Sequence, residues 1–359
     1  MSDRPRVVSV SAAEPPYRYA QAELLEQVRD RVLGPCWQTR PEAAESAREI
    51  ERLFIASRVE QRTSAVPPGY YDRARTTGER MAEYQPAAYG IGRAAVEACL
   101  RDAGARPADV TDLVVVSCTG YGAPGLDVLL ARDLGMPQDV RRVVVGHMGC
   151  FAAIVGLRQC LATVRSHPVA RALLLSVELP SLHFRPSLDT GDLVAFALFG
   201  DAAAAVLLAD GAAGGGPELV DTYCAADFSA AAQMTWTITD HGFVLGLSRR
   251  VPVTLRRNVA RVVARLLQPH GLEVQDVTHW IVHPGGPSIV EAVQGELELR
   301  DEQVALSWQV LREHGNCSSA TVLIILRELL RSGRALRGEW AVMLAFGPGL
   351  TLESCLLRF

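Results

Sequence analysis

The stretch RRVVVGHMGCFAAIVGLRQCL, residues 141–161, places a thiol where a strand gives way to a helix. A β-branched run ends at Gly146, and an amphipathic helical pattern begins near Cys150. A thiol in the first turn of a helix lies near unsatisfied backbone amides and the positive end of the helix dipole, which both stabilise a thiolate. Gly149 allows a sharp turn. The pattern favours a nucleophile, whereas the alternative is a small buried hydrophobic residue.

Two further residues are candidate partners for that thiol, because a reactive cysteine needs a base or a cation. His283 ends the apolar run of THWIVHPGG. Its side chain lies either in a cleft beside the glycine loop or in the core, held by hydrogen bonds. Asn316 in HGNCSSAT precedes a second helical pattern. Taken alone, an asparagine in that position is typical of a helix N-cap.

Buried-looking strands alternate with helices along the chain, which predicts sheets covered by helices on both faces. Helices are expected at 20–33 and 44–58, in the polar N-terminal 90 residues. Strands are expected at 112–117, 141–146, 170–176, 202–209, 278–284, 304–308 and 340–346. The glycine-rich GAAGGGPE, residues 211–218, is expected to be a surface loop between two halves.

The two halves resemble each other in sequence. Residues 99–120 align with 265–286 and share the motif DVT, and 146–158 align with 313–327, so that Asn316 falls close to the position of Cys150. ALLLSVELPSL likewise aligns with AVMLAFGPGLT. Chance similarity of two apolar βα units is the alternative, but the matches occur in the same order. We therefore predict a duplication of about 170 residues with halves 1–215 and 216–359, and a site that draws residues from both.

Composition excludes several classes of function. The 359 residues carry a net charge of −4, which gives no electrostatic indication of nucleic-acid binding. The chain contains no lysine, which removes Schiff-base chemistry and the P-loop lysine. Its eight cysteines form no C-x-x-C pair, so no zinc site is predicted. The N-terminus lacks a signal-peptide core and no apolar run reaches membrane-spanning length, so a soluble cytoplasmic protein is expected.

Five blocks carry a resemblance to a known family: GHMGCFAA, ALFGDAAAA, WIVHPGGPSIV, HGNCSSAT and AFGPGLTLE. In order and spacing they resemble the type III polyketide synthases, the chalcone synthase-like enzymes, from about residue 90 to the C-terminus. The resemblance implies an α/β protein with the duplicated thiolase fold, five layers αβαβα, and a helical N-terminal segment. It also implies an acyltransferase of secondary metabolism that acts as a homodimer on acyl-CoA and malonyl-CoA-type substrates. No metal or other cofactor is implied, and an acyl carrier protein is a further candidate donor.

By position, Cys150 matches the family's nucleophile, His283 its catalytic histidine and Asn316 its catalytic asparagine. An imidazolium at His283 is expected to stabilise the thiolate. Residues that match gatekeeper or cavity positions are Phe199, Leu245, Cys118, Ala123, His183, Ser318, Phe346, Gly347, Pro348 and Gly349, with Ala345 in place of the first glycine of the family's GFGPG loop. Arg52, Arg58 and Arg62 are candidates for binding CoA at a tunnel mouth; an ordinary solvated helix face is the alternative.

Several of these residues depart from the plant chalcone synthases. Leu245 replaces a second gatekeeper phenylalanine, Ala123 a methionine inserted by the partner subunit, and His183 and Cys118 two cavity threonines, while Ser318 keeps the family's serine. Small residues at 123 and 245 predict room for a flexible starter. His183 either limits elongation or is hydrogen-bonded away from the cavity.

The motifs MGCFAA, SVELPSLH and TGYGAPG are most similar to bacterial alkylpyrone synthases of the germicidin-synthase kind. We therefore expect an aliphatic starter, one to three malonyl-type extensions and release as a 4-hydroxy-2-pyrone, with closure to an alkylresorcinol as an alternative. Tetrahydroxynaphthalene formation from malonyl-CoA alone is less favoured. A β-ketoacyl-acyl-carrier-protein synthase III that condenses once and a non-catalytic acyl-binding protein are the rival hypotheses.

Overall fold

The strands form one mixed sheet whose two halves share the same topology. The computed structural model describes residues 4–34, 36–211 and 215–359. The first half contributes β1 (Pro5–Ala13), β4 (Asp112–Ser117), β5 (Arg141–Gly146), β6 (Arg171–Glu178) and β7 (Ala202–Asp210). The second contributes β8 (Glu218–Ala226), β11 (Val277–Val282), β12 (Trp340–Gly347) and β13 (Thr351–Arg358). Their order is β11-β12-β13-β8-β1-β7-β6-β4-β5.

The halves meet between β8 and β1, which are paired only at Arg6 and Glu218. Outward from this junction the orders are β1-β7-β6-β4 and β8-β13-β12-β11. In each half the first three strands are antiparallel neighbours, and the next pair is parallel. The topology agrees with a duplicated βα unit; β5 has no counterpart in the second half. The boundary between residues 215 and 216 stays a prediction.

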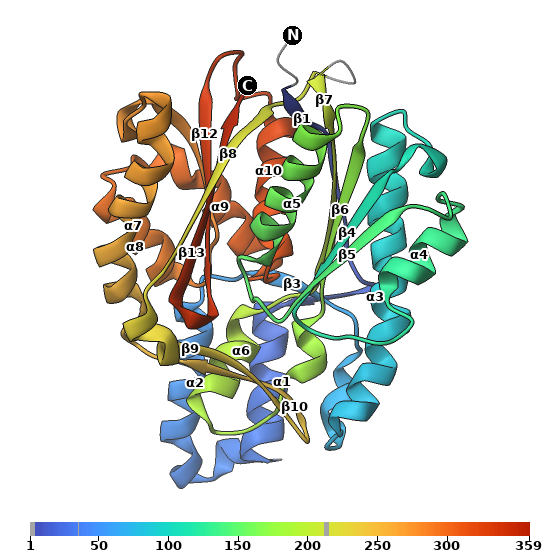
Figure 1. Cartoon of the computed structure of the whole chain (residues 1–359). Helices are drawn as coiled ribbons and strands as arrows, with labels where there is room; N and C mark the ends of the chain where they lie inside the picture. The colour runs from blue at the N-terminus through green and yellow to red at the C-terminus, as the bar shows by residue number, and fades with distance from the viewer. Residues whose placement is uncertain (1–3, 35, 212–214) are drawn as a thin grey trace.

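Helices cover the two halves of the sheet and fill the space between them, which gives five layers (Figure 1). The outer helices of the first half are α3 (Thr77–Asp102) and α4 (Leu126–Leu134), and those of the second are α7 (Val251–Leu267) and α8 (Pro287–Glu296). Between the halves lie α5 (Ala152–Ser166) and α10 (Ala320–Ser332), while α9 (Asp301–His314) packs against β11.

Three buried apolar clusters correspond to the three helical layers. The strand period of two sends successive side chains to opposite faces of the sheet. On β6, Leu174 joins the central cluster with Leu157 of α5, whereas Leu173 joins the outer cluster with Val96 of α3. The second half repeats this arrangement, with its own outer cluster around α7. The helices α5 and α10 are thus fixed between the two halves of the sheet.

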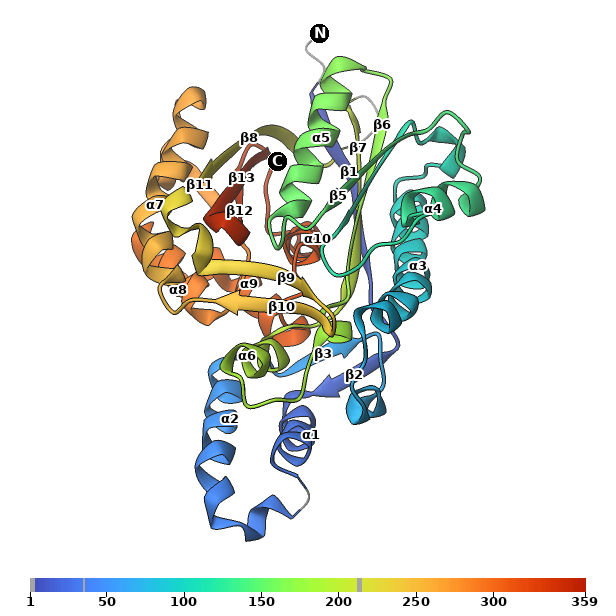
Figure 2. The same ribbon diagram turned by 60° about the horizontal axis from the view of Figure 1, so that its bottom comes forward.

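A smaller layer lies beneath the sheet and supplies one wall of the site (Figure 2). It contains β2 (Tyr17–Ala20), α1 (Gln21–Leu33), α2 (Ala44–Ala56), β3 (Gln61–Ser64), α6 (Thr190–Leu198), β9 (Met234–Thr239) and β10 (Gly242–Leu247). Buried apolar side chains of α1, α2 and α6 form its core. The two predicted N-terminal helices therefore exist.

One predicted strand is wrong: residues 304–308 lie inside α9. Val304, Ser307, Val310 and Leu311 are buried there, which is the spacing of a helix face. A five-residue apolar run does not by itself distinguish a buried helix from a strand. Of the predicted loop 211–218, residues 212–214 lie outside the described part of the chain. Within the described residues, no helix combines the length and apolar character that crossing a bilayer requires.

Candidate active site

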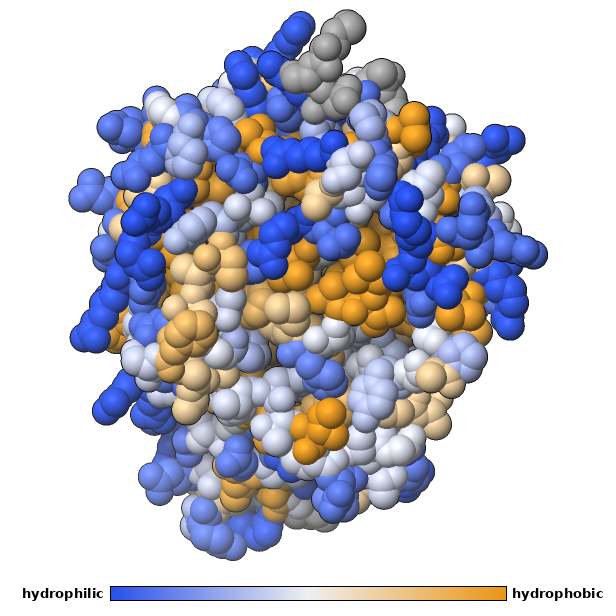
Figure 3. All heavy atoms as spheres, viewed as in Figure 1, coloured by the Kyte–Doolittle hydropathy of each residue, from blue (hydrophilic) through white to orange (hydrophobic). Residues whose placement is uncertain are grey.

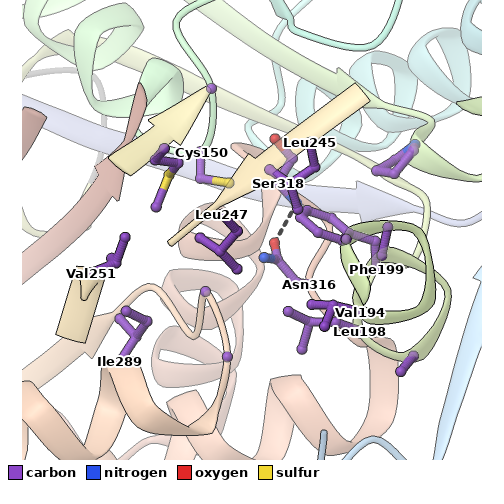
Figure 4. Close-up of a pocket in the computed structure, with 18 of the residues that line it drawn as sticks. Cys150, Val194, Leu198, Phe199, Leu245, Leu247, Val251, Ile289, Asn316 and Ser318 are labelled. Carbon is purple, nitrogen blue, oxygen red and sulfur yellow. Dashed lines mark hydrogen bonds between the residues drawn. The ribbon is translucent and has the colours of Figure 1, made fainter. Parts of the chain in front are cut away.

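A cavity of about 620 Å³ lies where the two halves and the lower layer meet. Cys150, His283 and Asn316 all line it, so the structure brings together the three predicted catalytic residues. Figure 4 shows the Cys150 sulfur and the Asn316 side chain directed into the same space. The rest of the lining is mostly apolar and includes Leu53, Val194, Leu198, Met234, Leu247, Val251 and Ile289.

Cys150 occupies a turn that only glycine neighbours permit. The helix α5 begins at Ala152 with Phe151 as its N-cap, so the cysteine lies just before the helix rather than in its first turn. Gly149 has φ +80°, and a Cβ there would approach Cδ of Pro348 to 2.3 Å. A Cβ on Gly347 would lie 2.6 Å from the Phe151 ring. The glycine–proline loop of the second half therefore packs directly on the nucleophile turn of the first.

Backbone hydrogen bonds hold Asn316 beside the end of α6. Its N–H donates to the Leu198 carbonyl at 2.8 Å, and its carbonyl accepts from the Gly200 N–H at 3.1 Å. The side-chain Oδ1 accepts from the Ser318 N–H at 2.8 Å (Figure 4). Because the oxygen is occupied, the amide nitrogen is the group left to donate into the cavity.

His283 follows the last residue of β11, and its backbone N–H donates to the Leu344 carbonyl at 2.8 Å. The side chain is 1% exposed, yet neither ring nitrogen has a hydrogen-bond partner among the described residues. A buried polar group without a partner costs about 1–3 kcal/mol. Proteins keep unpaired buried polar groups at functional sites, where a bound ligand supplies the missing hydrogen-bond partner. His283 is therefore arranged to hydrogen-bond a molecule in the cavity.

Burial determines the charge state of the nucleophile and its neighbour. Burial raises the pKa of the Cys150 thiol to about 12, an effect partly opposed by hydrogen bonds from Ser318 and Asn316. Burial also lowers the pKa of His283 to about 3. Burial thus favours a neutral thiol at Cys150 and a neutral imidazole at His283. This direction opposes the imidazolium expected from the sequence.

A hydrogen-bonded cluster behind the nucleophile was only partly predicted. The Cys118 sulfur accepts from the Gly149 N–H at 2.9 Å, which ties it to the nucleophile turn. Glu178, at the end of β6, accepts from the Cys118 N–H at 3.0 Å, from the Thr119 hydroxyl at 2.9 Å and from the Ser319 hydroxyl. Burial raises the pKa of Glu178 to about 7. The sequence signal for Glu178 was that it is the single carboxylate of β6 and follows a buried apolar run.

His183 belongs to an aromatic wall of the cavity. Its Nδ1 accepts from the Phe243 N–H at 3.1 Å, so its Nε2 carries the proton that is donated to the Thr119 carbonyl at 2.6 Å. Its ring stacks on that of Phe243 with centroids 4.2 Å apart, and Trp236 packs edge-on against both. The histidine is therefore fully hydrogen-bonded, as the second alternative expected, but it still lines the cavity instead of pointing away from it. Sequence patterns did not identify Trp236 and Phe243.

The remaining predicted cavity residues divide into two groups. Phe199, Leu245, Cys118, Ser318, Phe346 and Pro348 line the cavity. Gly347 and Gly349 do not; they shape the backbone of the adjacent loop. Ala123 lies in an exposed loop and does not reach the cavity of its own chain.

The three predicted CoA-binding arginines do not form one surface, because the stretch 51–62 is not a single helix. Arg62 lies in β3, is 2% exposed, and donates to the Phe199 carbonyl at 2.9 Å and to Gln21 Oε1 at 3.0 Å. Its assignment to a tunnel mouth is wrong. Arg58 is paired with Glu291 at 2.7 Å. Of these three arginines, Arg52 alone is exposed and has no ion pair among the described residues, and it precedes the cavity-lining Leu53.

Comparisons with known proteins agree with this geometry. Family models described as "Chalcone and stilbene synthases" match residues 71–212 (N-terminal domain) and 226–359 (C-terminal domain). A 1,3,6,8-tetrahydroxynaphthalene synthase of Streptomyces peucetius is 36% identical, over 98% of this chain and 93% of that protein. An alpha-pyrone synthesis polyketide synthase-like protein, Pks18, of Mycobacterium tuberculosis is 32% identical over 86% and 81%. The crystal structure of PKS-I from the brown alga Ectocarpus siliculosus superposes with a TM-score of 0.92 and 29% identity, over 100% and 99% of the two chains.

The Ser318 hydroxyl is expected to control the ionisation of Cys150. Ser318→Ala removes a hydrogen bond that lowers the thiol pKa, so alkylation of Cys150 by iodoacetamide should need a higher pH. A hydrogen bond to a charged group contributes about 1.5–3 kcal/mol, which corresponds to a shift of roughly one unit or more. Mass spectrometry of the Cys150 peptide across a pH series measures the shift. Ser288→Ala, at an exposed serine of the same cavity, is the matched control; an unchanged profile in Ser318→Ala would contradict the assignment.

Proposed function

The chain belongs to the chalcone and stilbene synthase family of type III polyketide synthases, and from that premise we propose that it extends an aliphatic acyl starter and releases an alkylpyrone. As a member it is an acyltransferase with the thiolase fold. The proposal concerns the residues that act, the starter and the product. The observation that carries it is the mostly apolar cavity into which Cys150, His283 and Asn316 all open.

Acyl loading begins with a proton transfer within the neutral pair. His283 accepts the thiol proton as Cys150 attacks the carbonyl of the starter thioester. The imidazolium and the tetrahedral oxyanion therefore form only as the new C–S bond forms. The tetrahedral intermediate collapses, the bond to the CoA sulfur breaks, and CoA thiolate takes the proton from His283. Burial lowers the pKa of His283, so its imidazole is unprotonated before the reaction but is a weak base. The proton transfer therefore accompanies formation of the C–S bond, when the developing negative charge favours the imidazolium.

Extension requires an uncharged hydrogen-bonding site for an enolate. In malonyl thioester, loss of CO₂ leaves the bonding electron pair on the α-carbon and thioester oxygen. The Asn316 amide and an N–H of His283 can both donate to that oxygen. A neutral amide suits this role, since it does not hold the malonyl carboxylate in place. The enolate carbon then attacks the acyl-Cys150 thioester, and the thiolate leaves ready for transfer of the longer chain.

The chemistry of the cavity wall supports an aliphatic starter. Leucine, valine, isoleucine, methionine and phenylalanine side chains make up much of the lining, and burying an alkyl chain against them is favourable. A chain made of malonyl units alone carries a carbonyl on every second carbon, and each buried carbonyl needs a donor. Leu245 in place of a larger aromatic residue leaves space beside Phe199 for the starter. Lactonisation of the extended chain then gives the pyrone.

A second product is favoured by one specific observation, the 36% identity to a 1,3,6,8-tetrahydroxynaphthalene synthase. In this alternative the chain condenses malonyl units only, and the aromatic wall of Trp236, Phe243 and His183 confines the growing chain. The protein named for alpha-pyrone synthesis, at 32% identity, is the counterpart for the first proposal.

Entry of substrate involves two arginines and Phe199. We assign contacts with the CoA phosphates to Arg52 and to Arg249, an exposed residue of the cavity lining. Phe199 separates the entrance from the inner cavity. The buried Arg62 holds its carbonyl, and Gln21 Nε2 donates to the Ala197 carbonyl at 2.8 Å, so both side chains fix the end of α6.

The product test uses the purified protein with octanoyl-CoA and malonyl-CoA, together and separately. We expect octanoyl-primed 4-hydroxy-2-pyrones, identified by mass, and little product from malonyl-CoA alone, because the apolar lining binds the alkyl starter. A pentaketide made from malonyl-CoA alone would establish the naphthalene alternative instead. A single-condensation product would indicate a β-ketoacyl synthase activity.

Two variants test the assigned roles within the same assay. Cys150→Ala should give no pyrone; full product formation by this variant would remove the nucleophile assignment. Asn316→Ala should lower the rate of malonyl-CoA decarboxylation by about 10²–10³, the effect of losing one donor to a developing oxyanion. Acylation of Cys150 in Asn316→Ala should remain, which separates the extension step from loading.

Arg62 is expected to act as a positioning residue for the gate. Arg62→Met removes the donor to the Phe199 carbonyl but keeps much of the side-chain volume, so the end of α6 loses its fixed position. We expect a broader distribution of product chain lengths, partly restored to the original in Arg62→Lys. Arg52→Ala is the exposed control and should affect the KM for CoA substrates only. Lower yield with an unchanged product distribution would show that Arg62 contributes stability alone.

We also propose that two copies associate through β5. This strand is the edge of the sheet, and its Val143 and Val144 are 38% and 60% exposed. Tyr121 and Val128 add apolar surface nearby in the first half, and Figure 3 shows hydrophobic side chains gathered where Figure 1 places β5. An exposed apolar edge strand pairs readily with another strand. Two-fold pairing of β5 with β5 would cover both edges at once.

Light scattering tests this association. Wild type should have twice the chain mass, and Val144→Arg should be monomeric because the substitution places a charge on the paired edge. The matched control is Val169→Arg, at an 89% exposed residue outside β5, which should stay dimeric. A monomeric wild type, or a Val144→Arg dimer, would exclude β5 as the interface.

A further inference from the structure

One surface carries a strong positive charge that the proposed chemistry leaves unused. Residues 241–272 contain no aspartate or glutamate and six arginines: Arg249, Arg250, Arg256, Arg257, Arg261 and Arg265. All six are exposed. The segment therefore contributes +6 to a chain whose net charge is −4, so the remainder carries −10. We call the last four, on α7, the α7 arginine face.

The α7 arginine face is not neutralised by the protein itself. Across the described residues, none of its arginines forms a salt bridge within 4.0 Å. Asp227, a carboxylate in contact with α7, accepts instead from Asn258 at 3.1 Å and from the Ser229 hydroxyl at 2.6 Å. Arg261 donates to Asn258, a neutral side chain. Clustered like charges repel one another, so an uncompensated set favours binding of an acidic partner.

The position of this face indicates what the partner delivers. Residues just before α7 and in its first turn line the cavity that contains Cys150, namely Leu247, Ser248, Arg249, Val251 and Pro252. The face continues from there along α7, the helix at the left of Figure 1. It lies on the opposite side from β5, which leaves it accessible when two copies pair there (Figure 1). A macromolecule bound to it would lie directly beside the route to the nucleophile.

We propose that the α7 arginine face docks an acidic acyl carrier protein, which presents the starter as a thioester on its phosphopantetheine arm. The proposal rests on the proposed function, because it names a donor for the same thiol. The arm is the pantetheine portion of CoA on a protein phosphate, so one entrance admits both donors. The acyl group passes from the arm sulfur to Cys150, with His283 first accepting the thiol proton and then returning it to the departing arm. Atoms and charge balance without a co-reactant.

The experiment compares two donors of the same acyl group. Octanoyl transfer to Cys150 is followed by intact mass, from octanoyl-CoA and from an octanoylated carrier protein of a bacterial fatty acid synthase. For the double variant Arg256→Glu/Arg257→Glu we expect the second-order rate from the carrier protein to fall by about tenfold or more, since steered association depends steeply on such charges. The rate from octanoyl-CoA should stay within about twofold, because neither residue lines the cavity.

The matched control is Arg334→Glu/Arg337→Glu, which alters the net charge by the same amount. These two arginines are exposed, and they precede β12, far from α7 in the sequence. It should leave both rates unchanged. An equal fall with both donors in the α7 variant would assign these arginines to free CoA. No transfer from the carrier protein to wild type, or transfer that both double variants preserve, would overturn the proposal.

Two outcomes separate this inference from other failures. If neither octanoyl-CoA nor the octanoylated carrier protein acylates the wild type, the proposed starter is wrong. The docking surface is then tested by repeating the comparison with other acyl groups on both donors. Cosedimentation with vesicles of anionic phospholipid provides the last comparison. Vesicle binding lost in Arg256→Glu/Arg257→Glu, with carrier-protein rates unchanged, would replace the carrier protein by a membrane surface.

Discussion

The two halves of the chain meet where the Pro348 ring packs on the backbone of Gly149 and the Phe151 ring packs on the backbone of Gly347. A Cβ at either glycine would meet its neighbour at 2.3 or 2.6 Å, closer than real Cβ atoms approach. The nucleophile turn belongs to the first half and the glycine–proline loop to the second. Because α5 and α10 are fixed between the two halves of the sheet, this contact sets where Cys150 lies relative to the residues of the second half.

Desolvation is the second constraint, and it acts on the same cavity. Burial favours the neutral forms of both Cys150 and His283, and it leaves the imidazole without a hydrogen-bond partner in the described structure. The protein thus keeps a polar group buried at a cost that a bound thioester can repay. In the proposed reaction, charge is created during the chemical steps and not stored beforehand. The uncharged Asn316, oriented by the Ser318 N–H, fits this proposal because a neutral amide can stabilise an oxyanion without binding the carboxylate that must leave.

The sequence predicted the features that depend on local pattern. Six of the seven expected strands exist, and the internal repeat corresponds to matching strand orders in the two halves. Where pattern is ambiguous the predictions were wrong. Residues 304–308 form a short apolar run that lies within a helix. Residues 51–62 include a helix end and a strand, so Arg62 points inward. Charge state was also beyond the sequence, since the neutral His283 results from burial by residues far along the chain. The aromatic wall of Trp236 and Phe243 required the tertiary contacts of β9 and β10.

The distribution of charge connects the cavity to its surroundings. Outside 241–272 the chain carries −10, and within it +6, so the positive charge is concentrated on one segment. Such an asymmetry would orient an acidic macromolecule toward α7 before contact. The pairing edge β5 lies on the other side, so a dimer would present two such faces, each beside its own entrance. An asymmetry of this kind acts through the association rate and weakens at high ionic strength, whereas the chemistry at Cys150 takes place in a buried cavity that salt screens little.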